Sequence, residues 1–173
     1  PGASLFIIKM IADKSTKKLL GLQVIGEGVV DKLVDMAVVA IALNASLEDL
    51  KDLDFAYAPP FSTAIHPFAN TVNVLLNKIN GEFDSITPRE YLAGKADGYK
   101  LIDASIVPKI DGAPYMDLSK VHEELADYGK DEKLLLVCDK GKRSYMLQKR
   151  LRSFGYTNLL SLEGGTIFNE LKK

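Results

Sequence analysis

The feature that most constrains the fold is the apolar run Leu134–Val137, which leads directly into the chain's only cysteine, Cys138. A short apolar run bounded by polar residues is typical of a strand that is buried on both faces. A helical pattern follows from Ser144 to Phe154. Cys138 is therefore predicted at the carboxyl end of a buried strand, in the turn that leads into a helix.

This position favours a reactive cysteine. The backbone N–H groups of a short loop and the positive end of a helix both stabilise an anion, and the thiolate is the reactive form of cysteine. Lys140, Lys142 and Arg143 add positive charge to the loop. A free cysteine can also serve simply as a small buried apolar side chain. The cluster of cations favours the functional interpretation.

Further motifs surround this loop in the second half of the chain. They are Lys100-Leu-Ile-Asp103, Ser153-Phe-Gly-Tyr-Thr-Asn158 and Leu162-Glu-Gly-Gly165. With the loop that opens at Cys138 and ends at Arg143, they resemble, in the same order, the motifs of rhodanese-type sulfurtransferases. The resemblance covers Ser85 to Lys173 and implies an α/β rhodanese-like domain with a central parallel sheet.

The resemblance also implies roles for the loop. Cys138 would carry a sulfane sulfur atom as a persulfide, and the loop N–H groups would stabilise the sulfur anion. Arg143 would complete the cradle, while Lys140 and Lys142 would attract anionic sulfur donors. The predicted substrate-binding residues are Asp139, Lys140, Gly141, Lys142, Arg143 and Ser144.

The chain departs from the family pattern after the first of these strands. The family usually continues from the aspartate with Val-Arg and later a Gly-His-Ile-x-Gly-Ala segment. Here Asp103 is followed by Ala104-Ser105 and then by the segment Ile106 to Ala113. These differences leave a second interpretation open, a rhodanese-like module that binds or regulates without turnover.

The remaining elements follow from local patterns. In the first half, strands at Leu5–Ile11 and Leu19–Ile25 predict a hairpin, a helix is predicted from Val29 to Leu43, and Ser46 and His66-Pro67 start two further helices, the last ending near Ile79. In the second half, Thr87 starts a helix. Strands at Lys100–Asp103, Leu134–Cys138 and Leu159–Leu162 then alternate with helices near Lys120–Ala126, Ser144–Phe154 and Ile167–Leu171. Such alternation predicts a parallel sheet.

The first half contains Lys18-Leu-Leu-Gly-Leu-Gln-Val-Ile-Gly26, Val30-Asp-Lys-Leu-Val-Asp35 and Tyr57-Ala-Pro-Pro-Phe-Ser62. These strings resemble the C-terminal dimerisation domain of pyridine nucleotide-disulfide oxidoreductases, in particular coenzyme A disulfide reductases and NADH oxidases. The resemblance implies an α+β domain that forms a homodimer. It also implies a loop that enters the partner subunit's active site, formed by Tyr57, Pro59, Pro60 and Phe61.

Composition narrows the function classes. The 173 residues carry Lys+Arg 22 and Asp+Glu 23, so no nucleic-acid footprint is expected. No apolar run of transmembrane length occurs. One cysteine suits the reducing cytoplasm, and two histidines with one cysteine predict no metal site. Gly26-Glu-Gly28 lacks the third glycine of a dinucleotide fingerprint, so no FAD or NAD(P)H is expected to bind this chain itself.

We therefore interpret the chain as a dimerisation domain, residues 1–83, joined at Phe83–Ile86 to a rhodanese-like domain, residues 84–173. It would be the C-terminal part of a flavin-dependent NAD(P)H disulfide, persulfide or polysulfide reductase that binds FAD elsewhere. Its small-molecule partners would be thiosulfate, polysulfide, persulfide or coenzyme A species. Phosphatase or arsenate-reductase chemistry is a rival that the loop length disfavours, and a purely structural dimerisation element is another.

Overall fold

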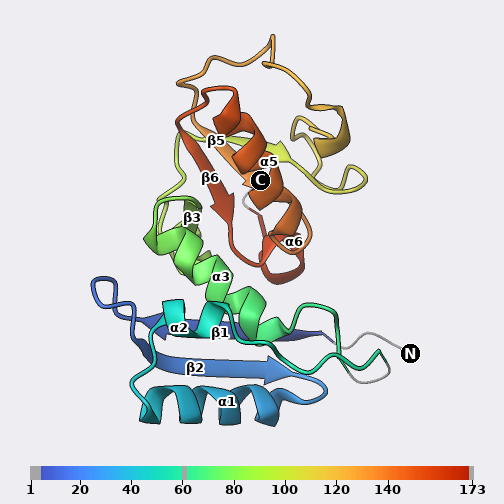
Figure 1. The fold of residues 1–173 in the computed structure, drawn as a ribbon. Coiled ribbons are helices and arrows are strands. Elements are labelled where there is room, and N and C mark those ends of the chain that lie inside the picture. The colour runs from blue at the N-terminus through green and yellow to red at the C-terminus, as the bar shows by residue number, and fades with distance from the viewer. Residues whose placement is uncertain (1–4, 60–61, 172–173) are drawn as a thin grey trace. The chain divides into compact units, whose positions relative to one another are not determined.

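The computed structural model describes residues 5–59 and 62–171 of the chain. Contacts between Cα atoms divide the chain into two compact units, Pro1–Gly81 and Glu82–Lys173. Figure 1 shows the fold, with the first unit in blue to green and the second in green to red. Each unit has its own hydrophobic core, and each is described by itself.

The first unit begins with the predicted hairpin (Figure 1). Strand β1 (Phe6–Ala12) pairs antiparallel with β2 (Leu19–Gly26). The turn between them is ordered by the Asp13 carboxylate, which accepts hydrogen bonds from the backbone N–H groups of Ser15 and Thr16. Side chains alternate along β1, because one face packs on the core while Ile7 and Ile11 on the other remain exposed.

Three helices complete the first unit, and all three were predicted. They are α1 (Val30–Ala42), α2 (Leu47–Lys51) and α3 (Pro67–Ile79). Ser46 caps α2 in a reciprocal capping box with Asp49, and the His66 side chain caps α3 by accepting from the N–H of Phe68. Leu33, Leu47 and Phe68 are buried where these helices meet.

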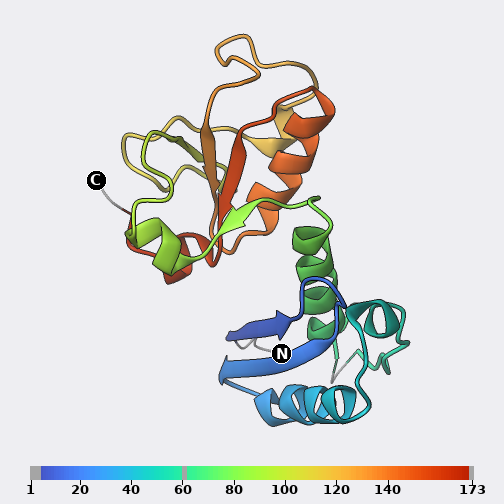
Figure 2. The same cartoon turned by 90° about the vertical axis from the view of Figure 1, so that its left-hand side faces the viewer.

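The second unit is built on a four-stranded parallel sheet in the order β3-β6-β5-β4 (Figure 2). Its strands are β3 (Ser85–Ile86), β4 (Lys100–Asp103), β5 (Leu134–Val137) and β6 (Leu159–Leu162). The predicted parallel sheet is thus confirmed. All four residues of β5 are buried, as expected for a central strand with both faces covered.

Helices and turns complete the second unit. They are α4 (Pro88–Leu92), the 3-10 helix η1 (Leu118–Lys120), α5 (Lys142–Ser153) and α6 (Gly165–Phe168). Leu134 and Leu136 of β5 pack on the side of α5, while Leu135 and Val137 belong to a separate cluster on the other face. Because β5 is packed on both faces, the position of the next residue, Cys138, before the start of α5 is fixed.

Three details differ from the sequence-based expectations. The helix predicted near Lys120–Ala126 does not form, and η1 ends at Lys120. The segment Phe83–Ile86 is not a free junction, because Phe83 packs edge-on against Tyr145 and Ser85–Ile86 forms β3. The last helix is α6, which begins before and ends short of the predicted Ile167–Leu171. Among the described residues, no helix is both long and apolar enough to cross a membrane.

Candidate active site

The candidate site begins at Cys138, the first residue after β5. Its side chain is 2% exposed. The Sγ atom accepts hydrogen bonds from the backbone N–H of Gly141 at 3.2 Å and of Ser144 at 3.4 Å. These donors lie at the cap and in the first turn of α5, where the helix leaves N–H groups without helical partners. The loop therefore directs partial positive charge at the sulfur atom.

Gly141 makes this geometry possible. As the N-cap of α5 it has φ 96° and ψ −22°, in the left-handed region that side-chain-bearing residues rarely adopt. Ser144 is fully buried, with its Oγ atom 3.8 Å from Sγ, and it donates a hydrogen bond to the carbonyl of Gly141 at 2.9 Å. Its hydroxyl can accept a hydrogen bond from the thiol or, by rotation, donate one to a thiolate.

The residues that follow the double glycine hold the backbone of the Cys138 loop in place. The N–H of Thr166 donates to the carbonyl of Cys138 at 3.0 Å, and the N–H of Ile167 donates to that of Asp139 at 3.1 Å. At Gly165 a Cβ atom would lie 1.9 Å from the carbonyl oxygen of Cys138, closer than any real contact. A glycine is therefore required at this position, and the motif Leu162-Glu-Gly-Gly165 has a direct structural reason.

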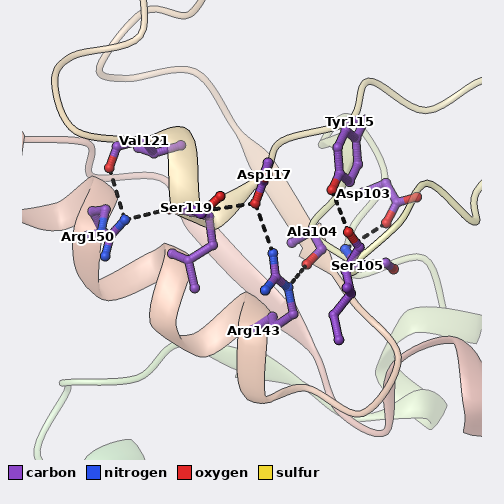
Figure 3. A network of polar contacts seen from close by, with 11 residues as sticks. Asp103, Ala104, Ser105, Tyr115, Asp117, Ser119, Val121, Arg143 and Arg150 are labelled. Atoms are coloured by element: carbon purple, nitrogen blue, oxygen red, sulfur yellow. Dashed lines mark hydrogen bonds and ion pairs between the residues drawn. The ribbon is translucent and has the colours of Figure 1, made fainter.

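The Arg143 side chain, in the first turn of α5, contacts Ala104 and Asp117 (Figure 3). Its Nε donates to the carbonyl of Ala104 at 2.9 Å, and its Nη2 lies 3.2 Å from Asp117 Oδ1. The pKa of Asp117 is lowered by hydrogen bonds from Ser119 and by Arg143. These contacts join the first turn of α5 to the segments that follow β4, so the described contacts of Arg143 are structural, and its role towards substrate stays a prediction.

Asp103 anchors the segment in which the chain departs from the family pattern. Its buried carboxylate accepts from the backbone N–H of Ser105 at 2.9 Å, Lys109 at 2.6 Å and Ile110 at 3.0 Å. Burial alone would raise the pKa of Asp103, but the hydrogen bonds from Lys109, Ser105 and Ile110 outweigh it, and the pKa is lowered. Tyr115 closes the same segment by donating to the carbonyl of Ile106 at 2.9 Å (Figure 3).

Ser105 stands where the rhodanese pattern usually has an arginine. The residue is fully buried, and its Oγ atom makes no hydrogen bond of good geometry among the described residues. The small side chain thus occupies a closed space that a guanidinium could not enter without rearrangement. The departure noted in the sequence is accommodated locally, by the three backbone hydrogen bonds to Asp103.

The charged side chains of this loop are either exposed or paired. Lys140 and Lys142 are exposed, as expected for residues that would attract anions. Asp139 instead forms an ion pair with Lys109, with Nζ and Oδ1 2.7 Å apart. Sequence reasoning missed Lys109, because no local pattern relates it to a loop thirty positions further along the chain.

The second predicted site lies in the first unit. Tyr57 is 61% exposed, in a segment that follows α2 and carries no regular structure. Ser62 orders this segment, since its Oγ accepts from the N–H of Ala58 at 2.8 Å. Pro59 is exposed, whereas the predicted loop residues Pro60 and Phe61 lie outside the described residues. Tyr57 thus belongs to a different unit from Cys138.

The described residues offer few features of a metal or dinucleotide site. Within residues 5–59 and 62–171, no group of three or more His, Cys, Asp or Glu side chains could hold a metal ion. Gly26 ends β2 and Gly28 lies between β2 and α1, but Asp31 stands at the third glycine position, where a carboxylate would repel a pyrophosphate. What the site can do chemically is stabilise a sulfur anion at Cys138.

Each of the two units matches a known protein family. Residues 75–166 match the family model described as a rhodanese-like domain, and residues 2–69 match the dimerisation domain of pyridine nucleotide-disulphide oxidoreductases. The crystal structure of reduced CoADR-RHD from Bacillus anthracis has a TM-score of 0.86 and 29% sequence identity, covering 96% of this chain and 31% of that one.

Two curated relatives match one unit each. Coenzyme A disulfide reductase of Staphylococcus epidermidis is 34% identical over 67 residues, which is 39% of this chain and 15% of the relative. Thiosulfate sulfurtransferase GlpE of Pseudomonas entomophila is 30% identical over 89 residues, covering 49% of this chain and 82% of the relative. The chain thus spans less than a fifth of the length of that reductase. It belongs to the rhodanese-like family, and its first unit is a dimerisation domain of the pyridine nucleotide-disulphide oxidoreductases.

Proposed function

We propose that Cys138 accepts a sulfane sulfur atom and carries it as a persulfide, in the C-terminal part of a flavin-dependent NAD(P)H reductase of disulfides, persulfides or polysulfides. The observation that supports this most directly is the pair of N–H donors at 3.2 and 3.4 Å from Sγ. Donors arranged before the reaction stabilise a developing anion without reorganisation. They suit a thiolate before sulfur transfer and a persulfide anion after it.

The transfer balances without any further oxidant. The Cys138 thiolate attacks the outer sulfur of thiosulfate, a new S–S bond forms, and the S–S bond of the donor breaks. Sulfite leaves with the bonding electron pair. The thiol proton leaves Sγ to solvent before the attack, and the Ser144 hydroxyl, 3.8 Å from Sγ, can then donate a hydrogen bond to the thiolate. Reduction of the persulfide to hydrogen sulfide needs two electrons, which we assign to FAD and NAD(P)H held by domains outside this chain.

The test is persulfide formation on the isolated chain. Incubation with thiosulfate, followed by intact-mass measurement, should show the gain of one sulfur atom that a reducing agent removes. Cys138→Ser should gain none while unfolding at the same denaturant concentration, because the change replaces one atom. Thiosulfate:cyanide sulfurtransferase activity then separates turnover from the alternative, a rhodanese-like module that binds or regulates. A wild-type chain that neither gains sulfur nor transfers it to cyanide would favour that alternative.

We also propose that the first unit forms a symmetric homodimer, within a reducing compartment such as the cytoplasm. Val34, Val38 and Ile41 recur on one face of α1 and are 37%, 58% and 38% exposed. An exposed apolar stripe of this kind is typical of an interaction surface, and two-fold pairing is the commonest homo-oligomer arrangement. In such a dimer the Tyr57 segment would reach the active site of the partner subunit.

Sedimentation of the chain at micromolar concentration tests the dimer. The wild-type chain should sediment as a dimer and Val38→Asp as a monomer. Leu92→Asp provides the control, because Leu92 is 67% exposed on α4 of the second unit. Equal sedimentation of all three proteins as monomers would contradict the assignment of this face.

A further inference from the structure

We propose that Lys109 is a positioning residue for sulfur transfer, which neutralises Asp139 and so keeps the surroundings of Cys138 favourable to anionic donors. The inference rests on the proposed function of Cys138, and it extends the site beyond the cysteine loop. Its central observation is the 2.7 Å contact between Lys109 Nζ and Asp139 Oδ1. The two side chains are 47% and 24% exposed, so the pair is partly shielded from water.

Lys109 is held in place by its own backbone. Its N–H donates to the buried Asp103 carboxylate at 2.6 Å, and the next N–H, of Ile110, does so at 3.0 Å. Asp103 itself ends β4, the strand next to β5. The ammonium group therefore extends from a backbone that is fixed to the sheet, rather than from a free surface loop.

Asp139 is equally constrained. Its carbonyl accepts from the N–H of Ile167 at 3.1 Å, and its Oδ1 is 3.5 Å from Thr166 Oγ1. Because it directly follows Cys138, an unpaired carboxylate here would repel both a thiolate and a dianion such as thiosulfate.

Other charges near the loop are differently engaged. Arg143 is paired with Asp117, and Lys140 and Lys142 are exposed to solvent. Among the described residues, Lys109 is the cation that contacts the Asp139 carboxylate. Removal of the Lys109 charge would therefore leave the negative charge of Asp139 beside Cys138. The exposed lysines Lys140 and Lys142 would offset that charge only weakly, because solvent and salt screen them.

The test uses two alkylating reagents that differ in charge. Iodoacetate is an anion and iodoacetamide is neutral, and both react with the same thiolate, so the ratio of their rates reports the potential at Sγ and not the fraction of thiolate. In Lys109→Gln the iodoacetate-to-iodoacetamide ratio should fall roughly threefold to tenfold at low salt. In Asp139→Asn it should rise. In the double variant it should return to within about twofold of wild type.

Lys130→Gln is the matched control, because Lys130 forms a similar ion pair with Glu124 at 2.5 Å but precedes β5, whereas Cys138 follows it at the opposite end of the strand. A ratio in Lys109→Gln equal to that of this control would overturn the inference while leaving the proposed function intact. A wild-type Cys138 that reacts with neither reagent and gains no sulfur from thiosulfate would overturn both. The substitution leaves the backbone N–H of Lys109 bonded to Asp103, so the variant should fold.

Discussion

The replacement of Gly165 by alanine tests how the cysteine loop is positioned. Gly165 has φ 54°, and an added Cβ would lie 1.9 Å from the carbonyl oxygen of Cys138 and 2.6 Å from that of Asp139. Both obstacles are backbone atoms, which cannot rotate away as a side chain could. The methyl group can be accommodated only if the loop and α6 move apart, and this movement would break the hydrogen bonds from Thr166 and Ile167.

The loss of folding stability expected for Gly165→Ala has two parts. A left-handed conformation costs an alanine roughly 1–2 kcal/mol, and a forced backbone shift in a packed region costs about 1–3 kcal/mol more. Together they amount to about 2–5 kcal/mol, a large share of the ~5–15 kcal/mol by which a domain is typically stable. Gly98→Ala isolates the first part, because Gly98 has φ 83° and nothing within 4 Å of the added carbon.

Urea unfolding, followed by near-ultraviolet circular dichroism, measures the difference in stability between Gly165→Ala and Gly98→Ala. Every tyrosine except Tyr57 lies in the second unit, so the aromatic signal reports mainly on that unit. Gly165→Ala should be less stable than Gly98→Ala and should form the Cys138 persulfide more slowly. Equal stability and equal persulfide formation in the two variants would refute the packing argument.

Three further predictions concern single side chains. The pKa of Glu90 is lowered to about 2 by hydrogen bonds from Lys95 and from Thr87. The stability that the Glu90 carboxylate contributes is therefore full above its ordinary pKa of 4.5 and is lost as the pH falls towards 2. Over that range, Glu90→Gln should lose less stability than the wild-type chain in an acid titration. Ser46→Ala should destabilise the first unit by about 1 kcal/mol in urea unfolding, because it removes the capping box of α2. Ser105→Ala should leave the urea midpoint unchanged or slightly raised, since it removes a buried hydroxyl without a hydrogen bond of good geometry, and a loss above about 1 kcal/mol would show that the hydroxyl is bonded.

The sequence predicts the secondary structure well where local interactions decide it. Three short patterns each predict the local conformation correctly. They are the apolar run Leu134–Val137, the capping box at Thr87 and the proline at the start of α3. The parallel sheet then follows from the alternation of strands and helices. These predictions succeed because periodicity and capping act over the same short range that the pattern samples.

The predicted helix at Lys120–Ala126 fails for a reason that lies elsewhere in the chain. A helix would need the carbonyl of Val121 to accept from the N–H of Leu125. In the structure the carbonyl of Val121 accepts from Arg150 at 3.1 Å, and the N–H of Leu125 donates to Tyr156 Oη at 2.8 Å. Side chains from distant elements thus replace the helical hydrogen bonds, and no local pattern could reveal this.

The site divides in the same way. The placement of Cys138 at the end of β5, with N–H donors from Gly141 and Ser144, follows from the strand–loop–helix order. The partners that brace the loop do not, because Arg143 binds Ala104 and Asp117 across the sheet edge. Which residues of the loop bind substrate stays a prediction, since the described contacts are all within the chain.

The pairing of β3 with β6 has a consequence for how the second unit is made. Ser85 and Ile86, near its beginning, lie beside Ser161 and Leu162, near its end, and Gln148 of α5 bonds the N–H and the carbonyl of Asp84. Contacts so distant in sequence slow folding, because the intervening chain must close first. During synthesis Cys138 would emerge from the ribosome before Thr166 and Ile167, whose N–H groups bind the carbonyls of Cys138 and Asp139. The Cys138 loop therefore gains these two supporting hydrogen bonds only after β6 has paired with β5 and α6 has packed against the loop.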